Sequence, residues 1–193
     1  MVKMIYRNDI FKSSIVSGKI ITYENGYYTK TWIVDTEHIE RGYSKSIEWL
    51  EDVTKKIELV QPGTIRKYGY VYDPNIQQKV GVYYAMNEIK GTPANLLPFV
   101  DVQGYFKKLI EKIVPLINER LKINAAAQDW HLANIMVENE GANITGIKTV
   151  DFERILEPFH IGGVISEINK WSLNNISIDK DLLKLLEKID DSK

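Results

Sequence analysis

The sequence contains no cysteine and no long apolar run. The absence of cysteine excludes disulfides, a thiol nucleophile and thiolate metal ligands. A transmembrane helix needs about 20 consecutive apolar residues, and no segment approaches that length. The first residues, "MVKMIYRNDIFKSS", lack the apolar core of a signal peptide. We therefore expect a soluble intracellular protein of the cytoplasm.

The chain also lacks an excess of charge of either sign. Lysine and arginine number 25 against 26 acidic residues, which gives a net charge of −1. Such a balance does not attract nucleic acid or an anionic membrane, so we expect neither as a partner. With 44% hydrophobic residues in a chain of 193, the composition is that of a globular protein with one domain or two small lobes.

The first half of the sequence indicates a sheet with one inserted helix. Short runs rich in Ile, Val, Thr, Tyr and Trp alternate with turn residues, and "ENG" at 24–26 is typical of a hairpin turn. Apolar residues at helical spacing predict a helix within 43–60, capped by Ser44 or Ser46. The predicted strands cover 13–18, 19–24, 27–35, 65–73 and 79–89.

The second half is expected to be mainly helical. After a loop at 88–98, residues 101–123 predict a long helix that Pro115 kinks or breaks. A hairpin follows, with strands at 134–138 and 144–150, then a loop with Gly162 and Gly163, and a helix over 179–190. We expect an α+β fold with two lobes, 1–88 and 89–193, joined by a hinge near 85–92, and a ligand cleft between them.

Three oxygen-bearing side chains flank the predicted hairpin. Asn134 opens its first strand, Asp151 follows its second, and Asp129 lies five residues before Asn134. Because antiparallel pairing brings the two ends of a hairpin together, Asn134 and Asp151 are expected to be neighbours, with Asp129 on the loop leading in. Carboxylate and amide oxygens are ligands that suit Mg²⁺, which takes its remaining ligands from water and phosphate.

The segments "QDWHLANIMV" and "VDFE" resemble the catalytic loop and metal-binding motif of the kinase-like phosphotransferases, most closely the aminoglycoside phosphotransferase and choline kinase branch. "YYAMNEIKGTP" at 83–93 is similar to the hinge of that branch. The resemblance covers roughly residues 80–155 by motif and implies a two-lobed protein-kinase-like fold, with a β-rich N-lobe and a short helical C-lobe. It also implies a kinase that uses ATP and Mg²⁺ to phosphorylate a hydroxyl of a small molecule or a protein.

The resemblance further implies a role for individual residues. Asp129 would orient or deprotonate the acceptor hydroxyl, and Asn134 and Asp151 would hold Mg²⁺. Lys30 would pair with the nucleotide phosphates, with Lys19 and Lys45 as alternatives. Glu48 or Glu51 would hold that lysine. Backbone groups from Met86 to Glu88 would bind the adenine.

The sequence departs from the family pattern at three places. Ala127 and Gln128 replace the usual His-Gly or His-Arg before Asp129, no Gly-x-Gly-x-x-Gly loop is present, and only 42 residues follow Asp151. These departures leave open a pseudokinase or binding module without turnover, or transfer of AMP instead of phosphate. A metal-dependent phosphoesterase using Asp129, His131 and Asp151 is a further alternative, although a structural role in bracing the loop is favoured for His131.

Overall fold

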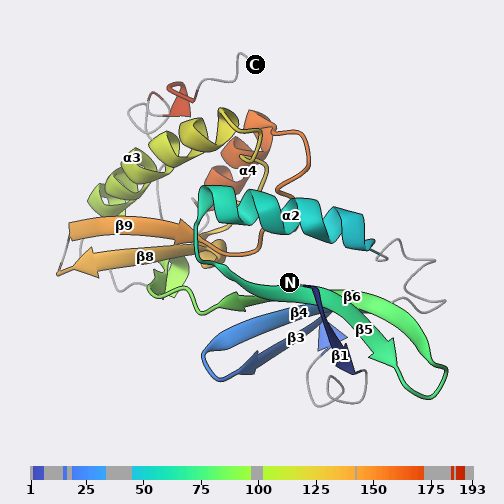
Figure 1. The fold of residues 1–193 in the computed structure, drawn as a ribbon. Helices are drawn as coiled ribbons and strands as arrows, with labels where there is room; N and C mark the ends of the chain where they lie inside the picture. The colour runs from blue at the N-terminus through green and yellow to red at the C-terminus, as the bar shows by residue number, and fades with distance from the viewer. Residues whose placement is uncertain are drawn as a thin grey trace. The chain divides into compact units, whose positions relative to one another are not determined.

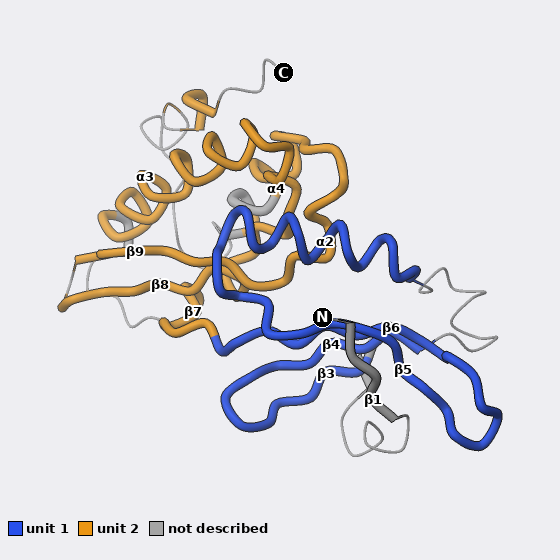
Figure 2. Tube along the Cα trace, in the orientation of Figure 1, with its two compact units in different colours: residues 1–88 blue, residues 89–193 orange. Residues whose placement is uncertain are grey.

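A computed structural model describes residues 2–6, 15–16, 19–33, 45–96, 102–141, 143–171, 184 and 186–189. The chain divides into two compact units, residues 1–88 and residues 89–193 (Figure 2). Each unit has its own secondary structure and its own buried side chains. In the described part of the chain, every helix is too short or too polar to cross a membrane.

The first unit is built on a six-stranded sheet in the order β1-β5-β6-β4-β3-β2. All neighbouring strands are antiparallel except β1, which lies parallel to β5. Strand β6 lies between β5 and β4, and every residue from Val80 to Met86 is buried, so both of its faces are covered and its sequence does not alternate between apolar and polar residues. The strands span Val2–Tyr6 (β1), Ile15–Val16 (β2), Lys19–Glu24 (β3), Tyr27–Ile33 (β4), Ile65–Asp73 (β5) and Gln78–Asn87 (β6).

The hairpin between β3 and β4 confirms the turn predicted at "ENG". Asn25 and Gly26 adopt φ angles of 51° and 78°, as a two-residue turn matched to the strand twist requires. Strand β1 was not predicted. Its pairing with β5 joins residues more than 60 positions apart, from Val2 with Tyr68 to Tyr6 with Tyr72, and local turn signals carry no information about such a contact.

One helix, α2 (Ile47–Val60), covers this sheet and begins at one of the two predicted caps. The Ser46 hydroxyl accepts a hydrogen bond of 3.1 Å from the backbone N–H of Trp49. Leu50, Val53 and Ile57 are fully buried, at the spacing of one helical face, and α2 packs on β5 and β6. The helix ends at Val60, and the N–H of its C-cap residue Gln61 donates to the carbonyl of Ile57.

The second unit combines helices with a small sheet (Figure 1). A three-stranded sheet in the order β7-β8-β9 contains the predicted hairpin, whose strands pair from Ile135 with Thr149 to Glu140 with Asn143. The elements span Thr92–Pro93 (β7), Ala94–Leu96 (η2), Val102–Leu121 (α3), Leu132–Asn134 (η3), Ile135–Glu140 (β8), Asn143–Thr149 (β9) and Ile161–Trp171 (α4).

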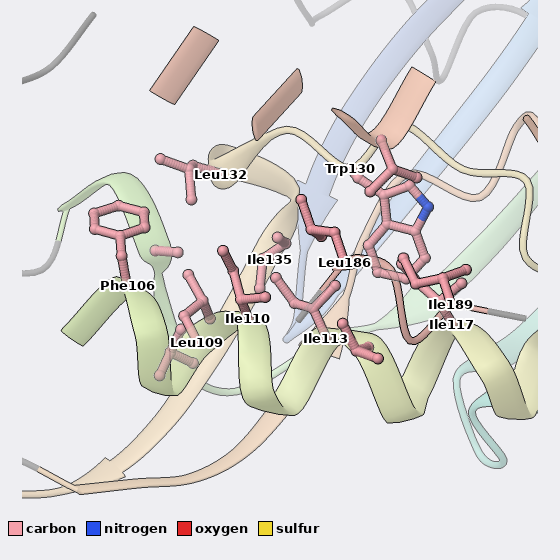
Figure 3. Close-up of a cluster of buried hydrophobic side chains, with 14 of the residues drawn as sticks. Phe106, Leu109, Ile110, Ile113, Ile117, Trp130, Leu132, Ile135, Leu186 and Ile189 are labelled. Atoms are coloured by element: carbon pink, nitrogen blue, oxygen red, sulfur yellow. The ribbon is translucent and has the colours of Figure 1, made fainter. Parts of the chain in front are cut away.

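The core of this unit lies along one face of α3. Phe106, Leu109, Ile110, Ile113 and Ile117 recur at helical spacing and are almost fully buried. Figure 3 shows them directed toward side chains from three other segments, Trp130 and Leu132 before β8, Ile135 in β8, and Leu186 and Ile189 near the C-terminus. Ala126 belongs to the same cluster, so the loop that carries Asp129 is anchored to the hydrophobic core before that residue by Ala126 and after it by Trp130 and Leu132.

One prediction for this unit is excluded in part and another is wrong. Helix α3 runs through Pro115 from Val102 to Leu121, so the break expected at this proline does not occur, while the kink stays a prediction. Pro115 is exposed, so water can satisfy the carbonyl that loses its partner. Gly162 and Gly163 lie in the first turn of α4 instead of a loop, because Ile161, Val164 and Ile165 supply an apolar face at helical spacing. Most of the helix predicted over 179–190 lies outside the described residues.

Candidate functional site

The β8–β9 hairpin brings Asn134 next to the segment that carries Asp151. The backbone carbonyl of Asn134 accepts a hydrogen bond of 2.9 Å from the N–H of Val150. Strand pairing begins one residue further on, where Ile135 lies opposite Thr149. Both side chains are partly exposed at this end of the hairpin. An amide oxygen and a carboxylate are therefore supplied from adjacent backbones.

Asp129 is connected to the same place through Asn134. The Asn134 side-chain Nδ2 donates a hydrogen bond of 3.2 Å to the backbone carbonyl of Asp129. This contact identifies which end of the Asn134 amide is Nδ2, because a carbonyl only accepts, and it leaves Oδ1 as the end that can bind a cation. The loop between them is closed by His131, whose Nδ1 accepts from the N–H of Ala133 at 3.2 Å. That bond caps η3 and gives His131 the structural role expected for it.

The backbone of Asp151 is unusual. Its φ angle of 63° lies in the left-handed region, which residues other than glycine seldom adopt. Left-handed non-glycine residues carry a conformational cost of about 1–3 kcal/mol and concentrate at functional sites. The surrounding contacts therefore hold a carboxylate in a conformation that the chain itself does not favour.

A buried network lies directly behind these loops, and the sequence analysis did not predict it. Arg120, in the last turn of α3, is only 2% exposed. Its Nη1 donates to Oε1 of Gln128, and its Nη2 donates to Oγ1 of Thr149 at 2.8 Å. Gln128 in turn donates from Nε2 to the carbonyl of Val150 at 3.0 Å. The residue before Asp129 is thus tied to the residue before Asp151.

The Arg120 guanidinium also contacts two aromatic rings. It lies 5.5 Å from the ring centre of Trp130 and 6.0 Å from that of Phe152, within the range of cation–π attraction. Burial lowers the pKa of Arg120 to about 10, while the nearby charge of Glu119 acts in the opposite direction. At neutral pH the side chain is therefore a buried cation. A signal for it exists in the sequence, since Arg120 stands three residues after Ile117, on the buried face of α3.

A pocket of about 140 Å³ opens beside Asp129 within the second unit. One wall is the segment from Ala127 to Trp130, and the other is formed by residues between Arg154 and Ser166. The polar and charged residues of the lining are Gln128, Asp129, Arg154, His160 and Ser166, set among apolar ones. The Arg154 Nε donates to Glu157 at 2.7 Å, which steadies this second wall.

The predicted phosphate lysine, Lys30, is buried in the first unit with 7% of its surface exposed. It lies in β4 opposite Ile21 and Tyr84. Because residues two apart share a face of a strand, Lys30 is on the same face as Trp32, whose ring meets Trp49 of α2 at 5.4 Å. Lys30 therefore lies on the face of the sheet that α2 covers. Lys19 is in β3, and Lys45 sits over the Trp49 ring at 4.7 Å.

The two candidate partners of Lys30 differ in their surroundings. Glu48 is exposed and belongs to the helix start, where hydrogen bonds from its own backbone N–H and from Ser46 lower its pKa. Glu51, one turn further along α2, is partly buried and precedes the buried residues Val53 and Thr54. Glu51 therefore borders the packed face of α2. The pairing of either glutamate with Lys30 stays a prediction.

The proposed adenine-binding segment ends the central strand of the first unit. Met86 is buried and pairs with Tyr28 on one side and Ile65 on the other. Glu88 is exposed, and its backbone N–H donates at 3.0 Å to the carbonyl of Gly26 at the tip of the β3–β4 hairpin. The Glu88 carboxylate also accepts from the Tyr23 hydroxyl at 3.3 Å, and its charge raises the pKa of Tyr23. The hairpin tip is thus fastened to Glu88.

The donor chemistry of the second unit fits a hard cation with oxygen ligands. Asp151 and Asn134 supply oxygens from adjacent backbones, and Mg²⁺ binds proteins through one or two such groups. Within the described ranges, no three His, Asp or Glu side chains gather closely enough to hold a metal. The phosphoesterase alternative needs such a cluster of Asp129, His131 and Asp151.

Comparison with known proteins identifies the fold. No family model and no curated protein matches the sequence. The structure of WaaP in complex with acyl carrier protein superposes with a TM-score of 0.53 and 12% identity, covering 91% of this chain and 76% of WaaP. WbdD, a bifunctional kinase–methyltransferase co-crystallised with a kinase inhibitor, gives a TM-score of 0.50 and 15% identity. That match covers 90% of this chain, which spans only 44% of the WbdD chain.

A pseudokinase structure also aligns, with a TM-score of 0.48 and 12% identity over 99% of this chain and 81% of that one. At these levels of identity the WaaP and WbdD matches establish the fold and nothing finer. The chain has a mixed α+β, protein-kinase-like fold with a β-rich N-terminal part, as the sequence motifs predicted.

Proposed function

We propose that the chain is an ATP- and Mg²⁺-dependent phosphotransferase that acts on a hydroxyl group. The observation that carries the proposal is the connected set of Asp129, Asn134 and Asp151. Asn134 bonds to the backbone of Asp129 through its side chain and to Val150 through its carbonyl, so all three residues are held at one end of the hairpin. On a protein-kinase-like fold, this set corresponds to the parts that position an acceptor and a metal.

The proposed roles follow from charge and position. Asp129 lines the pocket and accepts the proton of the acceptor hydroxyl as the new P–O bond forms. The bond between the γ-phosphorus and the β–γ bridging oxygen breaks, and ADP leaves. Asn134 and Asp151 hold Mg²⁺, which when bound neutralises charge on the phosphate oxygens. The chain's own contribution is to fix these groups in place, which is the main requirement of phosphoryl transfer.

The pocket beside Asp129 is proposed as the acceptor site. Its volume of about 140 Å³ is close to that of a cavity known to accept a single benzene ring, of roughly 150 Å³. Drug-sized ligands occupy larger pockets, of about 300–1,000 Å³. We therefore expect only the hydroxyl-bearing end of the acceptor to enter. Both a small molecule and a protein side chain can present a group of that size.

We assign nucleotide contacts to the first unit. Lys30 is the proposed partner of the α- and β-phosphates, and its burial in β4 supports a specific role over a solvent-facing lysine. Met86 and Glu88 are proposed to contact adenine within a hinge at 85–92, and Glu48 or Glu51 to hold Lys30. The "QDWHLANIMV" and "VDFE" motifs support placement in the aminoglycoside phosphotransferase and choline kinase branch.

One observation favours a second candidate, a pseudokinase or binding module without turnover. The Glu88 N–H, which an adenine would use, already donates to Gly26. Nucleotide binding through that group requires the hairpin tip to release it. A chain that keeps this hydrogen bond would bind nucleotide weakly.

The deciding experiment is turnover of ATP labelled on the γ-phosphate, with Mg²⁺ and a pool of hydroxylated acceptors, followed by mass analysis of the product. The phosphotransferase proposal predicts a gain of about 80 Da in the acceptor, the mass of one phosphoryl group, and a fall of roughly 100-fold or more in kcat for Asp129→Asn, since a base in the transition state contributes 10²–10⁴-fold. A gain of one AMP would indicate nucleotidyl transfer. Absence of any product, with nucleotide bound, would favour the binding module.

A further inference from the structure

The buried network of Arg120, Gln128 and Thr149 has no proposed role in proton transfer or metal binding, although Gln128 also lines the pocket, yet it connects the two loops that carry Asp129 and Asp151. We propose that Arg120 and Gln128 are positioning residues, which set Asp151 and its neighbour Asn134 in register with Asp129. This inference rests on the proposed function, because it assigns to that site the contacts that determine its geometry. Arg120, Gln128 and Thr149 together form the Arg120 network.

The orientation of Gln128 is fixed by its two partners. Arg120 can only donate, so it must face the Gln128 oxygen, and the Val150 carbonyl can only accept, so it must face the Gln128 nitrogen. Only one of the two flipped orientations of the amide therefore satisfies both partners. A residue at position 128 must accept on one side and donate on the other, which an amide does and an ionised carboxylate does not.

The hydrogen bonds of Gln128 act on residues directly adjacent to Asp129 and Asp151. Gln128 immediately precedes Asp129, and Val150 immediately precedes Asp151. The Val150 N–H also donates to the carbonyl of Asn134, so the backbone of Val150 is held at both its N–H and its C=O, by Asn134 and by Gln128. Next to it, Asp151 adopts φ 63°, a conformation that needs such support.

The choice of arginine is explained by the fork of its guanidinium. Two nitrogens reach two acceptors on different segments, Gln128 on the loop and Thr149 at the end of β9. Lysine has a single nitrogen and cannot reproduce this geometry. Neither of these acceptors is a carboxylate, so the guanidinium makes hydrogen bonds to neutral groups, and the nearby charge of Glu119 offsets the cost of its burial only in part. Stability alone does not select such an arrangement, since buried charge is costly.

The decisive variant is Gln128→Glu. The carboxylate is nearly isosteric and still accepts from Arg120, with a charge-assisted and stronger bond. The adjacent cation keeps it ionised, so it cannot donate to Val150 and instead places an oxygen against that carbonyl. The two sides of the Arg120 network are thus separated, since the contact with Arg120 is retained and the contact with Val150 is lost. Gln78→Glu, on an exposed strand residue of the first unit, is the matched control for added charge.

The experiment measures, for each variant, the Mg²⁺ concentration that half-saturates ATP binding, together with amide hydrogen exchange at Val150. Residues that orient a metal ligand typically contribute 10- to 100-fold to metal affinity or activity. We expect Gln128→Glu to raise the Mg²⁺ concentration at half-saturation by about that factor and to speed amide exchange at Val150. Its melting temperature should be at or above that of the control. Thr149→Val, which removes one acceptor of Arg120, should shift both readouts in the same direction by less, and serves if Gln128→Glu does not fold.

Two outcomes overturn the inference. If Gln128→Glu matches the control in both Mg²⁺ dependence and Val150 exchange, the Arg120 network only stabilises the fold. If its melting temperature falls while both readouts stay unchanged, the conclusion is the same. Should the wild-type protein bind no nucleotide, the proposed function fails by that result, and exchange at Val150 alone then decides whether the network holds the two loops together.

Discussion

The left-handed backbone of Asp151 predicts that two variants lacking its carboxylate will differ in stability. With φ at 63°, any side chain bearing a Cβ atom is strained there, and glycine is not. Asp151→Ala and Asp151→Gly both remove the carboxylate, so comparing them isolates the backbone. We expect Asp151→Gly to be more stable than Asp151→Ala by about 1 kcal/mol, after the entropy cost of glycine is included.

For a chain of this size, that difference corresponds to a shift of roughly 2–4 °C in melting temperature. Thermal and urea unfolding followed by circular dichroism would measure it. Asp52 offers a control of opposite sign, because it is exposed in the middle of α2, where glycine is less favourable than alanine by about 1 kcal/mol. If Asp151→Ala proves equal to Asp151→Gly or more stable, Asp151 is not left-handed and the geometry of the site is wrong.

Three further predictions concern stability. Ser46→Ala removes the cap of α2 and should lower the free energy of unfolding by about 1 kcal/mol, whereas Ser46→Asp should not; equal loss in both would exclude a capping role. Gly81→Ala should destabilise by about 1–3 kcal/mol or prevent folding, because its Cβ would lie 2.1 Å from the Trp32 carbonyl oxygen, and an unchanged urea midpoint would contradict that register. Burial raises the pKa of Tyr105 to about 12, so stability should fall as pH rises from about 10 to 12, with a smaller fall in Tyr105→Phe; identical pH profiles would refute this.

The elements that sequence analysis predicted well are those determined by local interactions. The Asn25–Gly26 turn needs two residues that tolerate positive φ, and Ser46 stands immediately before an apolar period of 3.6. The β8–β9 hairpin is equally local, so the proximity of Asn134 to the segment after β9 could be deduced from antiparallel pairing alone. The proton-accepting and metal-binding roles of these residues remain predictions.

The elements that were missed depend on contacts between residues far apart in the chain, or on burial that offsets an unfavourable local preference. Strand β1 is determined by a parallel partner far along the chain, and α4 forms although Gly162 and Gly163 disfavour helix, because its apolar face is buried. Arg120 is the clearest case at the site. A charged residue in a helix is expected to face water, and only the aromatic rings and the Gln128 and Thr149 acceptors of the folded chain show why this one is buried.

The central claim is that Asn134 and Asp151 hold a Mg²⁺ ion that carries the nucleotide phosphates. The most direct measurement is thermal unfolding with ATP, Mg²⁺, both or neither, on the wild-type protein, Asp151→Asn and the exposed control Asp52→Asn. ATP at about 100 times its dissociation constant should stabilise the wild type by roughly 2.7 kcal/mol, only when Mg²⁺ is present. Asp151→Asn should lose most of that gain and Asp52→Asn should keep it. Stabilisation that is independent of Mg²⁺, or equal in Asp151→Asn and the wild type, would contradict the claim.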